Sequence, residues 1–393
     1  MSAGMADRWA RHDAEWRQPA QIVSHWRDAP AVDRRLLRCT VSGQWWETLA
    51  DLGITLLVSR EYEHLLVGLS VTRGQPRVTF MPMPHPSGIA FDGDRGAVHV
   101  ASTRNPNQVF ELRPAQGALK RLDAPGGRLE DRPLVPVCSR FLPGCCYLHD
   151  LAIVGGVLYG ASAGQNAIVP LSDGYGEAVW WPKCIDSPSG PRLGQNYIQL
   201  NSIAAGPTLE DSFFSASTDL PSVRRPGHRN FRVDRRGVIF SGRTREAVVR
   251  GLTRPHSARL HHGELWVDDS GYGQLSRVSH GKAEAAVGLP GWTRGLCFAA
   301  GVAFVGTSRV IPRFSQYAPG LDVDRSRCGL HAIEVASGRV LGSLTWPYGN
   351  QVFAVEAVPS GFTTGFPFGL QGGSSRKQLF YTFKVREADG SGG

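Results

Sequence analysis

The chain lacks a long apolar run. No stretch of about 18 apolar residues occurs among its 393 residues, so a membrane span is not expected. The N-terminus, MSAGMADRWARHDAEWRQPA, is charged throughout and has no apolar core of a secretory signal. Seven cysteines, an odd number without metal-type spacing, fit reduced thiols better than a disulfide framework. These absences predict a cytoplasmic protein with no membrane partner.

Motifs for nucleotides and nucleic acids are absent too. There is no phosphate-binding loop, dinucleotide fingerprint, nucleophile elbow or zinc-finger spacing, so we expect no nucleotide cofactor. The formal net charge is +9, but the basic residues are scattered and no aromatic–basic stripe accompanies them. We therefore expect no nucleic-acid partner, and the excess charge fits an Arg-rich solvated surface or a small acidic ligand. No pattern indicates the oligomeric state.

What the chain does have is glycine, 47 residues, and proline, 26 residues. Beyond about residue 45 it reads as short runs of Val, Leu, Ile and Phe broken by turn residues. These runs repeat at intervals of 38 to 62 residues, each with a leading polar residue, an apolar strand, a turn and a second apolar strand. The copies are SGIAFDGDRGAVHVAST, HDLAIVGGVLYGASA, NSIAAGPTLEDSFFSAST, HSARLHHGELWVDDSG, RGLCFAAGVAFVGTS and, more weakly, FAVEAVPSGFTTGFP.

Six copies of this size predict an all-β fold, a six-bladed β-propeller. We expect a helical or irregular N-terminal strap over residues 1–45, the propeller over 46–385 and a disordered tail over 386–393. Two β-sandwich domains are the alternative, which six copies in one register argue against. The last copy lacks outer strands of its own, and either residues 53–70 or the C-terminal KQLFYTFKV could supply them.

Several of these segments resemble a known family. HDLA, NSIA, GLTRPHSARLHHGELWVDDSG and LPGWTRGLCFAAGVAFVG are similar, in the same order, to motifs of a bacterial family that is known only as a domain of unknown function. The resemblance spans roughly residues 50 to 360 and implies the propeller, but it implies no chemistry. More distantly, the architecture is similar to gluconolactonase-like and strictosidine-synthase-like six-bladed propellers, whose metal-ligand pattern is not visible in this chain.

The leading residue of each copy opens the innermost strand of its blade. Equivalent positions of all blades then form a ring at one rim of the central channel. We call these six residues the inner ring: Ser87, His149, Asn201, His256, Arg294 and Phe353.

Two histidines and an asparagine in adjacent blades suit one divalent transition metal such as Zn, Fe or Mn. On this interpretation His149, His256 and Asn201 are the ligands, and Asp150 is an alternative ligand or orients His149. Without a metal, His149 or His256 serves as a general base with Asp150 orienting it. A structural role, in which these side chains cap exposed backbone groups, is the plain alternative.

The remaining candidates are substrate contacts. Arg294 would hold a carboxylate or phosphate in its fork. Ser87, Asn201 and His85 lie on or near the same rim, and Tyr197 belongs to the segment that leads into it. The sequence thus predicts an enzyme of hydrolase, lyase or isomerase type that acts on a small anionic substrate. The rival prediction is a non-catalytic ligand-binding or protein-binding scaffold.

Overall fold

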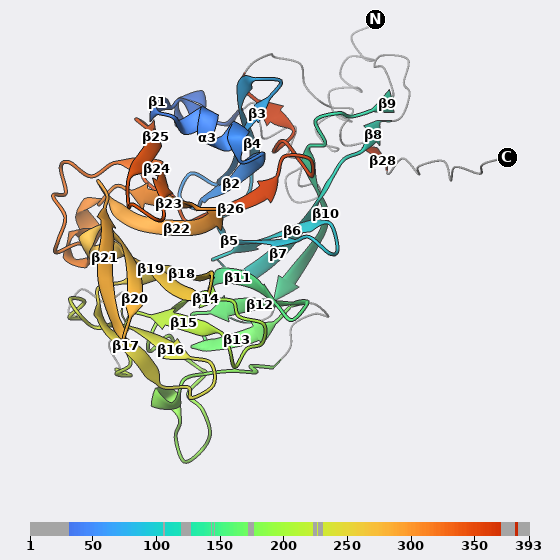
Figure 1. Cartoon of the computed structure of the whole chain (residues 1–393). Helices are drawn as coiled ribbons and strands as arrows, with labels where there is room; N and C mark the ends of the chain where they lie inside the picture. Colours follow the sequence, from blue (N-terminus) through green and yellow to red (C-terminus); the bar gives the residue numbers. More distant parts are fainter. Residues whose placement is uncertain are drawn as a thin grey trace, which may run out of the picture.

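The computed structural model describes residues 31–104, 107–118, 127–142, 144, 146–171, 177–222, 226, 231–370 and 382–383. Six antiparallel sheets surround a common axis, which confirms the predicted six-bladed propeller (Figure 1). The innermost strands are β5 (Pro86–Asp92), β11 (Leu148–Val154), β14 (Leu200–Ala204), β18 (Pro255–His261), β22 (Trp292–Ala299) and β26 (Ala354–Pro359). Each begins at or within one residue of the predicted inner-ring position, apart from β22, which begins two residues earlier.

The outer strands follow in chain order within each blade. β5 is followed by β6 (Ala97–Ser102), β7 (Asn107–Pro114) and β10 (Leu134–Leu142), and β11 by β12 (Val157–Ser162) and β13 (Ala167–Pro170). β14 is followed by β15 (Phe213–Ala216), β16 (Gly237–Ser241) and β17 (Ala247–Leu252). β18 is followed by β19 (Glu264–Asp269), β20 (Gln274–Ser279) and β21 (Lys282–Gly288). β22 is followed by β23 (Val302–Ser308), β24 (Cys328–Glu334) and β25 (Val340–Trp346), with β1 (Thr40–Gly43) on the outer edge.

The N-terminal strands close the ring. β26 pairs with β2 (Ile54–Arg60), which is followed by β3 (Leu65–Thr72), β4 (Gln75–Pro82) and β27 (Phe368–Gly369). Of the two closures predicted, the early segment is therefore the one used. In the C-terminal segment, β28 (Thr382–Phe383) pairs instead with β8 (Gly117–Ala118), which also pairs with β9 (Gly127–Arg128). The predicted tail, residues 386–393, and residues 1–30 of the predicted strap lie outside the described residues.

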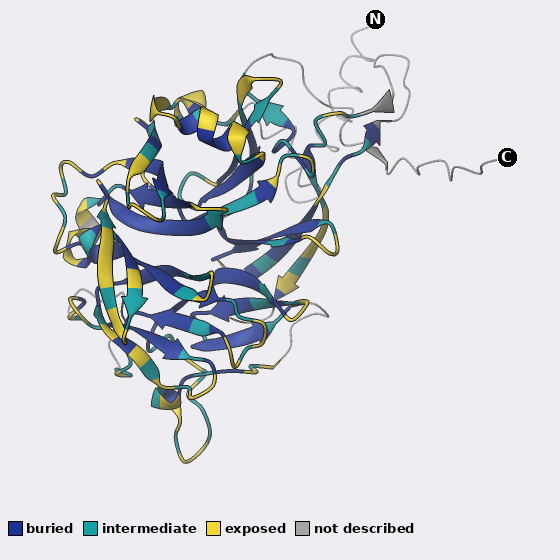
Figure 2. Cartoon of the chain, viewed as in Figure 1, coloured by how far each residue is buried: buried dark blue, intermediate teal, exposed yellow. Residues whose placement is uncertain are grey.

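Apolar residues fill the spaces between blades, because each sheet buries both faces against its neighbours. Figure 2 shows the strands around the axis as buried, and many turns and the outermost strand β21 (Lys282–Gly288) as largely exposed. α3 (Trp45–Asp51) lies over β25 and β3, and the Trp45 ring contacts Phe304 edge to face with centroids 6.0 Å apart. The other helices among the described residues are short 3-10 segments, namely η2 (Arg34–Leu37), η3 (Lys183–Ile185), η4 (Ser270–Tyr272) and η5 (Pro312–Tyr317). No helix in the described ranges is long and apolar enough to cross a membrane.

Close approach of the inner strands depends on small residues. A Cβ on Gly88 of β5 would lie 2.6 Å from the Cα of Asp150 on β11, which no side chain tolerates. Glycine at this position therefore lets the first two blades meet at the axis.

Ser59 of β2 joins three strands at the closure. Its hydroxyl donates to the Ser87 carbonyl at 2.6 Å and accepts from the Ala354 N–H at 3.0 Å. We expect Ser59→Ala to lower the free energy of unfolding by about 1–3 kcal/mol, because it leaves a buried N–H and a buried carbonyl without a partner. Urea unfolding measures this, with Ser189→Ala, an exposed serine, as the control. Equal stability of the two variants would show that the closure does not depend on this hydroxyl.

Candidate functional site

The inner-ring residues converge at the end of the axis where the inner strands begin, which we call the first end. All six are buried, with at most 6% of any residue exposed. The His149 and His256 ring centroids lie 6.3 Å apart, and the Phe353 ring lies 5.6 and 5.3 Å from them. The sequence register therefore placed residues from distant repeats in one cluster, as predicted.

Irregularities in the backbone pairing direct these side chains toward the axis. The pairing register of β11 shifts between Leu148 and Asp150, and that of β14 shifts between Leu200 and Ser202. Similar shifts occur at the inner-ring positions of β5, β18 and β22. A bulge leaves one residue unpaired and redirects its side chain. His149 and Asn201 are the unpaired residues of their strands.

A second ring lies two residues before the first. We call it the outer ring, and its members are His85, Tyr147, Gln199, Arg254, Trp292 and Gln351. The first four have left-handed φ values of 42°, 51°, 51° and 57°. Such conformations are uncommon for non-glycine residues and concentrate at functional sites. The same strained conformation in four blades supports a functional first end.

His149 is a neutral imidazole with one free nitrogen. The Asn201 amide group donates to the Pro255 carbonyl at 2.8 Å, so its oxygen faces Nδ1 of His149, 2.7 Å away. Nδ1 must then carry the hydrogen, which leaves a lone pair on Nε2. Nε2 is buried and has no hydrogen-bond partner among the described residues. Burial, and then the positive charge of Arg294, lower the pKa of His149 from 6.5 to about 3.

His256 is held in the opposite tautomer. The Arg294 guanidinium can only donate, and its Nη2 lies 3.0 Å from Nε2 of His256, so Nε2 accepts. Nδ1 then donates to the Ser257 hydroxyl, 2.8 Å away, which also accepts from the Gly295 N–H. Burial, and then Arg294, lower the pKa of His256 well below its ordinary value. Both nitrogens of His256 are therefore engaged within the protein.

Two buried arginines at the first end have no carboxylate within ion-pair distance among the described residues. Arg294 lies between the Phe353 and Trp292 rings, with its guanidinium carbon 4.1 and 5.1 Å from their centroids, and its Nε has no hydrogen-bond partner. Arg254 donates to Gln199, Ser217 and Pro226 and lies 4.6 Å from the Tyr317 centroid. Burial lowers the pKa of Arg254 to about 10 and also lowers that of Arg294. Buried cations are usually paired, so this arrangement indicates a site for an anion.

The anion that most favours the charged form of Arg294 is Glu61, which has partners of its own. Glu61 accepts from Thr103 at 2.5 Å and lies 3.6 Å from Arg104. Arg104 is half exposed and lies 5.7 Å from the Tyr147 ring centroid. Tyr147 in turn contacts the His149 ring, with centroids 4.7 Å apart. Tyr147 and the Glu61–Arg104 pair therefore adjoin the buried cluster where it approaches solvent.

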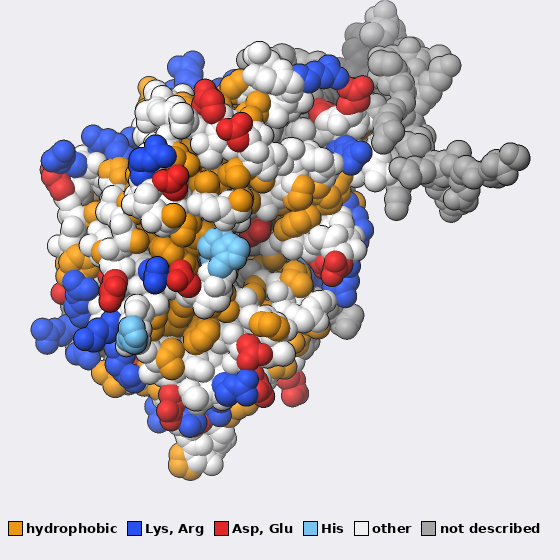
Figure 3. Space-filling model, viewed as in Figure 1, with side chains coloured by type: hydrophobic (Ala, Val, Ile, Leu, Met, Phe, Trp, Pro, Cys, Tyr) orange, Lys and Arg blue, Asp and Glu red, His pale blue; other side chains and the backbone are white. Residues whose placement is uncertain are grey.

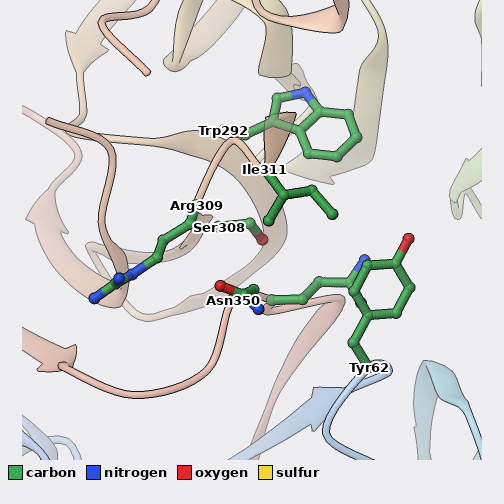
Figure 4. Close-up of a pocket in the computed structure, with 7 residues that line it drawn as sticks. Tyr62, Trp292, Ser308, Arg309, Ile311 and Asn350 are labelled. Carbon is green, nitrogen blue, oxygen red and sulfur yellow. The ribbon is translucent and has the colours of Figure 1, made fainter. Parts of the chain in front are cut away.

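A small hollow with room for about one water molecule lies beside Trp292. The residues around it are Tyr62, Trp292, Ser308, Arg309, Ile311, Asn350 and Gln351. Trp292 and Ile311 lie on one side of it and Tyr62 and Asn350 on the other (Figure 4). Trp292 thus lines the hollow and also contacts Arg294 of the inner ring.

The predicted metal ligands do not fit a metal as they are arranged. His149 offers a lone pair, but Nε2 of His256 accepts from Arg294 and the Asn201 oxygen accepts from His149. In the ranges that the structure describes, no three His, Cys, Asp or Glu side chains are grouped so that they could hold a metal ion. The metal stays a prediction. Near-stoichiometric Zn, Fe or Mn in protein purified without a metal-affinity tag, lost in a His149→Ala/His256→Ala variant, would establish it.

Asp150 does not orient His149. Asn201 does so, and Asp150 instead receives two bonds from Arg259, at 2.7 and 3.2 Å, and two from the backbone N–H groups of Leu151 and Ile203. This buried pair links the second, third and fourth inner strands in chain order, β11, β14 and β18. Asp150 is satisfied there, so its geometry supports a structural role.

The other predicted contacts lie around the cluster. The Ser87 hydroxyl donates to the Leu148 carbonyl at 2.9 Å, which ties β5 to β11. His85 packs against His64 with centroids 4.2 Å apart, and its Nδ1 has no hydrogen-bond partner in the described part of the chain. Tyr197 packs into the apolar cluster around Trp180 and Phe214 and not against the inner ring.

Sequence reasoning missed several charged or polar residues near the axis. Arg254 and Gln351 lie two residues before inner-ring positions, and the same register could have found them. Arg259 and Glu356 both lie three residues after such positions. Burial raises the pKa of the half-buried Glu356 to about 7, against the lowering effect of Arg259 and with a further rise from Asp150. The position of Arg259 and Glu356, each three residues after an inner-ring residue, was the sequence signal that could have identified them.

Charge on the molecular surface is mixed. Figure 3 shows Lys and Arg spread over the visible face with Asp and Glu among them. Many exposed arginines pair with nearby carboxylates, such as Arg243 with Asp211 at 2.8 Å and Arg250 with Asp219 at 2.9 Å. The net charge of +9 is therefore not gathered into one continuous patch on this face.

The lowered pKa of His149 predicts an acid-sensitive stability. The folded-state pKa of about 3 lies below the ordinary 6.5, so the unfolded chain binds the proton first and stability is lost as pH falls below about 6.5. From pH 7.5 to 5.0 this group should remove about 2 kcal/mol from the free energy of unfolding. Urea unfolding of the parent and of His149→Gln at both pH values measures it. The variant should lose less stability than the parent, whereas His262→Gln, at an exposed site, should match the parent. Equal losses in all three proteins would contradict the assignment.

Comparisons with known proteins find structural neighbours and one family. A chain in the crystal structure of a nidogen/laminin complex has a TM-score of 0.50 and 9% identity, over 78% of this chain and 99% of that one. A gluconolactonase from Xanthomonas campestris has a TM-score of 0.44 and 12% identity, over 75% of this chain and 86% of that one. No curated protein sequence matches the chain significantly. The sequence profile of one family, described as a domain of unknown function (DUF4915), matches residues 43–364. The chain belongs to this family.

Proposed function

We propose that this protein binds a small anionic molecule at the first end of the axis and acts on it as an acid–base enzyme. The observation that carries the proposal is Arg294, a buried guanidinium with no carboxylate within ion-pair distance among the described residues. A buried charge without a partner is costly, and an anionic ligand would supply the missing partner. Arg254 adds a second positive charge nearby, since each of the two arginines lowers the pKa of His149.

His149 is the residue best suited to move a proton. Its Nε2 lone pair is free and its ring is fixed by Asn201. In the unliganded protein its pKa of about 3 makes it a poor base, because Arg294 and burial disfavour the imidazolium. A bound anion would offset the charge of Arg294 and raise the basicity of His149 when the substrate is in place.

This arrangement suits removal of a proton from a bound acid or from water, with Arg294 holding the negative charge. The proposal therefore keeps the hydrolase, lyase and isomerase types together. Tyr147 and the Glu61–Arg104 pair would have to move for a ligand to enter, since the ring residues are at most 6% exposed.

We expect Arg294→Met to weaken anion binding at least about tenfold, because a charge-assisted hydrogen bond to a buried group is lost. The measurement is the rise in unfolding temperature with increasing inorganic phosphate or propionate, at constant ionic strength. Arg277→Met, which removes an exposed arginine paired with Glu264 at 3.3 Å, is the matched control and should bind like the parent. Unchanged binding by Arg294→Met would refute the site.

A second measurement separates the enzyme from the rival scaffold. His149→Gln should retain most of the affinity for the anion but lose conversion of any acid that the parent transforms, followed by proton NMR. Binding by the parent without conversion of any acid tested would favour a non-catalytic ligand-binding propeller. Full conversion by His149→Gln would exclude His149 as the base.

A further inference from the structure

This inference rests on the proposed function and concerns the chemical class of the ligand. The first end holds buried polar atoms of two kinds that lack partners among the described residues. Arg294 Nε is a donor and needs an acceptor. His149 Nε2 and the side-chain oxygen of Gln351 are acceptors and need donors.

These atoms are almost completely removed from water. His149 and Gln351 are each 3% exposed and Arg294 is 6% exposed. An unsatisfied buried polar group costs about 1–3 kcal/mol, so native structures rarely keep several together without a role. A carboxylate or phosphate alone would satisfy Arg294, but it offers no donor to either acceptor.

Gln351 and Arg294 are linked through Trp292, which lies next to both. Gln351 and Trp292 both line the hollow, and the Arg294 guanidinium carbon lies 5.1 Å from the Trp292 centroid. On its other side, Arg294 donates to His256 and packs against Phe353, whose ring also contacts His149. A ligand whose anionic end meets Arg294 therefore has one acceptor on each side.

The hollow suits one small polar group of a ligand. Trp292 and Tyr62 provide aromatic surface, Ile311 an aliphatic contact, and Ser308 and Asn350 belong to the polar part of the lining. The space has room for about one water molecule, which is the size of a single hydroxyl group.

We infer that the ligand is a small hydroxylated anion, a carboxylate or phosphate whose hydroxyl groups donate to Gln351 and His149. Arg294 binds the anionic end, and one hydroxyl group enters the hollow beside Gln351. This deepens the proposed site by specifying donors on the ligand as well as its charge.

Matched probes test the inference. Glycerate and propionate share one carbon skeleton and differ in two hydroxyl groups, as do glycerol 3-phosphate and propyl phosphate. Affinities for the parent come from isothermal titration calorimetry. We expect at least about tenfold tighter binding of the hydroxylated member, since each hydroxyl satisfies a buried acceptor. The better of the two pairs identifies carboxylate or phosphate as the anionic end.

Variants assign the preference to the hollow. Gln351→Met removes the acceptor at similar size and should reduce the preference for the hydroxylated member severalfold. Gln316→Met, at an exposed position, is the control and should keep it. If Gln351→Met does not fold, Asn350→Leu tests the same wall.

The outcomes distinguish the two proposals. Equal affinities within both pairs would overturn this inference while leaving the anion site intact. A preference that Gln351→Met keeps in full would overturn the role of the hollow. No binding of any probe to the folded parent would overturn the proposed function itself.

Discussion

Closure of the ring is the constraint on which the rest of this structure depends. The six blades meet around an axis only because β26, late in the chain, pairs with β2, which lies almost 300 residues earlier. Ser59 reinforces this junction by bonding to β5 and β26 together. Without the pairing between β2 and β26, both strands would have an unpaired edge. The six inner strands would then not present their first residues to a common point.

Convergence around the axis has an electrostatic cost. Placing His149, His256, Arg294 and Arg254 in one buried cluster removes each from water, and every pKa shift among them has burial as its first cause. The two histidines respond by staying neutral, which is the state that can accept a hydrogen bond or proton. The arginines stay charged, since guanidinium does not lose its proton in proteins. A cluster of neutral histidines and charged arginines is complementary in charge and hydrogen bonding to an acidic ligand.

Farther along the axis the charges are balanced differently. Asp150 and Arg259 form a two-bond pair across β14, and this pair anchors three blades rather than serving the ring. Glu356 lies near it with a pKa raised to about 7. The axis thus has a first end where Arg294 and Arg254 lack a carboxylate within ion-pair distance among the described residues, and a second region where Asp150 and Glu356 accompany Arg259.

The fold was readable from the sequence because each repeat carries its own pattern. A leading polar residue, two apolar strands and a glycine turn recur six times, and local hydrophobic periodicity is enough to count the blades. The inner ring followed from the same register, since equivalent positions of a closed propeller must meet. The early strands were also recognised as candidates for closure, although the C-terminal segment competed with them.

What the sequence could not decide is which atoms face one another. Hydrogen-bond partners such as Asn201 for His149, or Arg259 for Asp150, lie 52 and 109 residues apart and depend on bulges that leave no clear sequence signal. The same packing makes Nε2 of His256 accept a hydrogen bond from Arg294. Of the two histidines in one register, only His149 then keeps a free lone pair, so the two do not form a metal-binding pair. Local sequence determined the blades and the composition of the ring. Only tertiary packing decided the tautomers, the partners and the two buried arginines without a carboxylate, because those depend on distances between strands that periodicity does not encode.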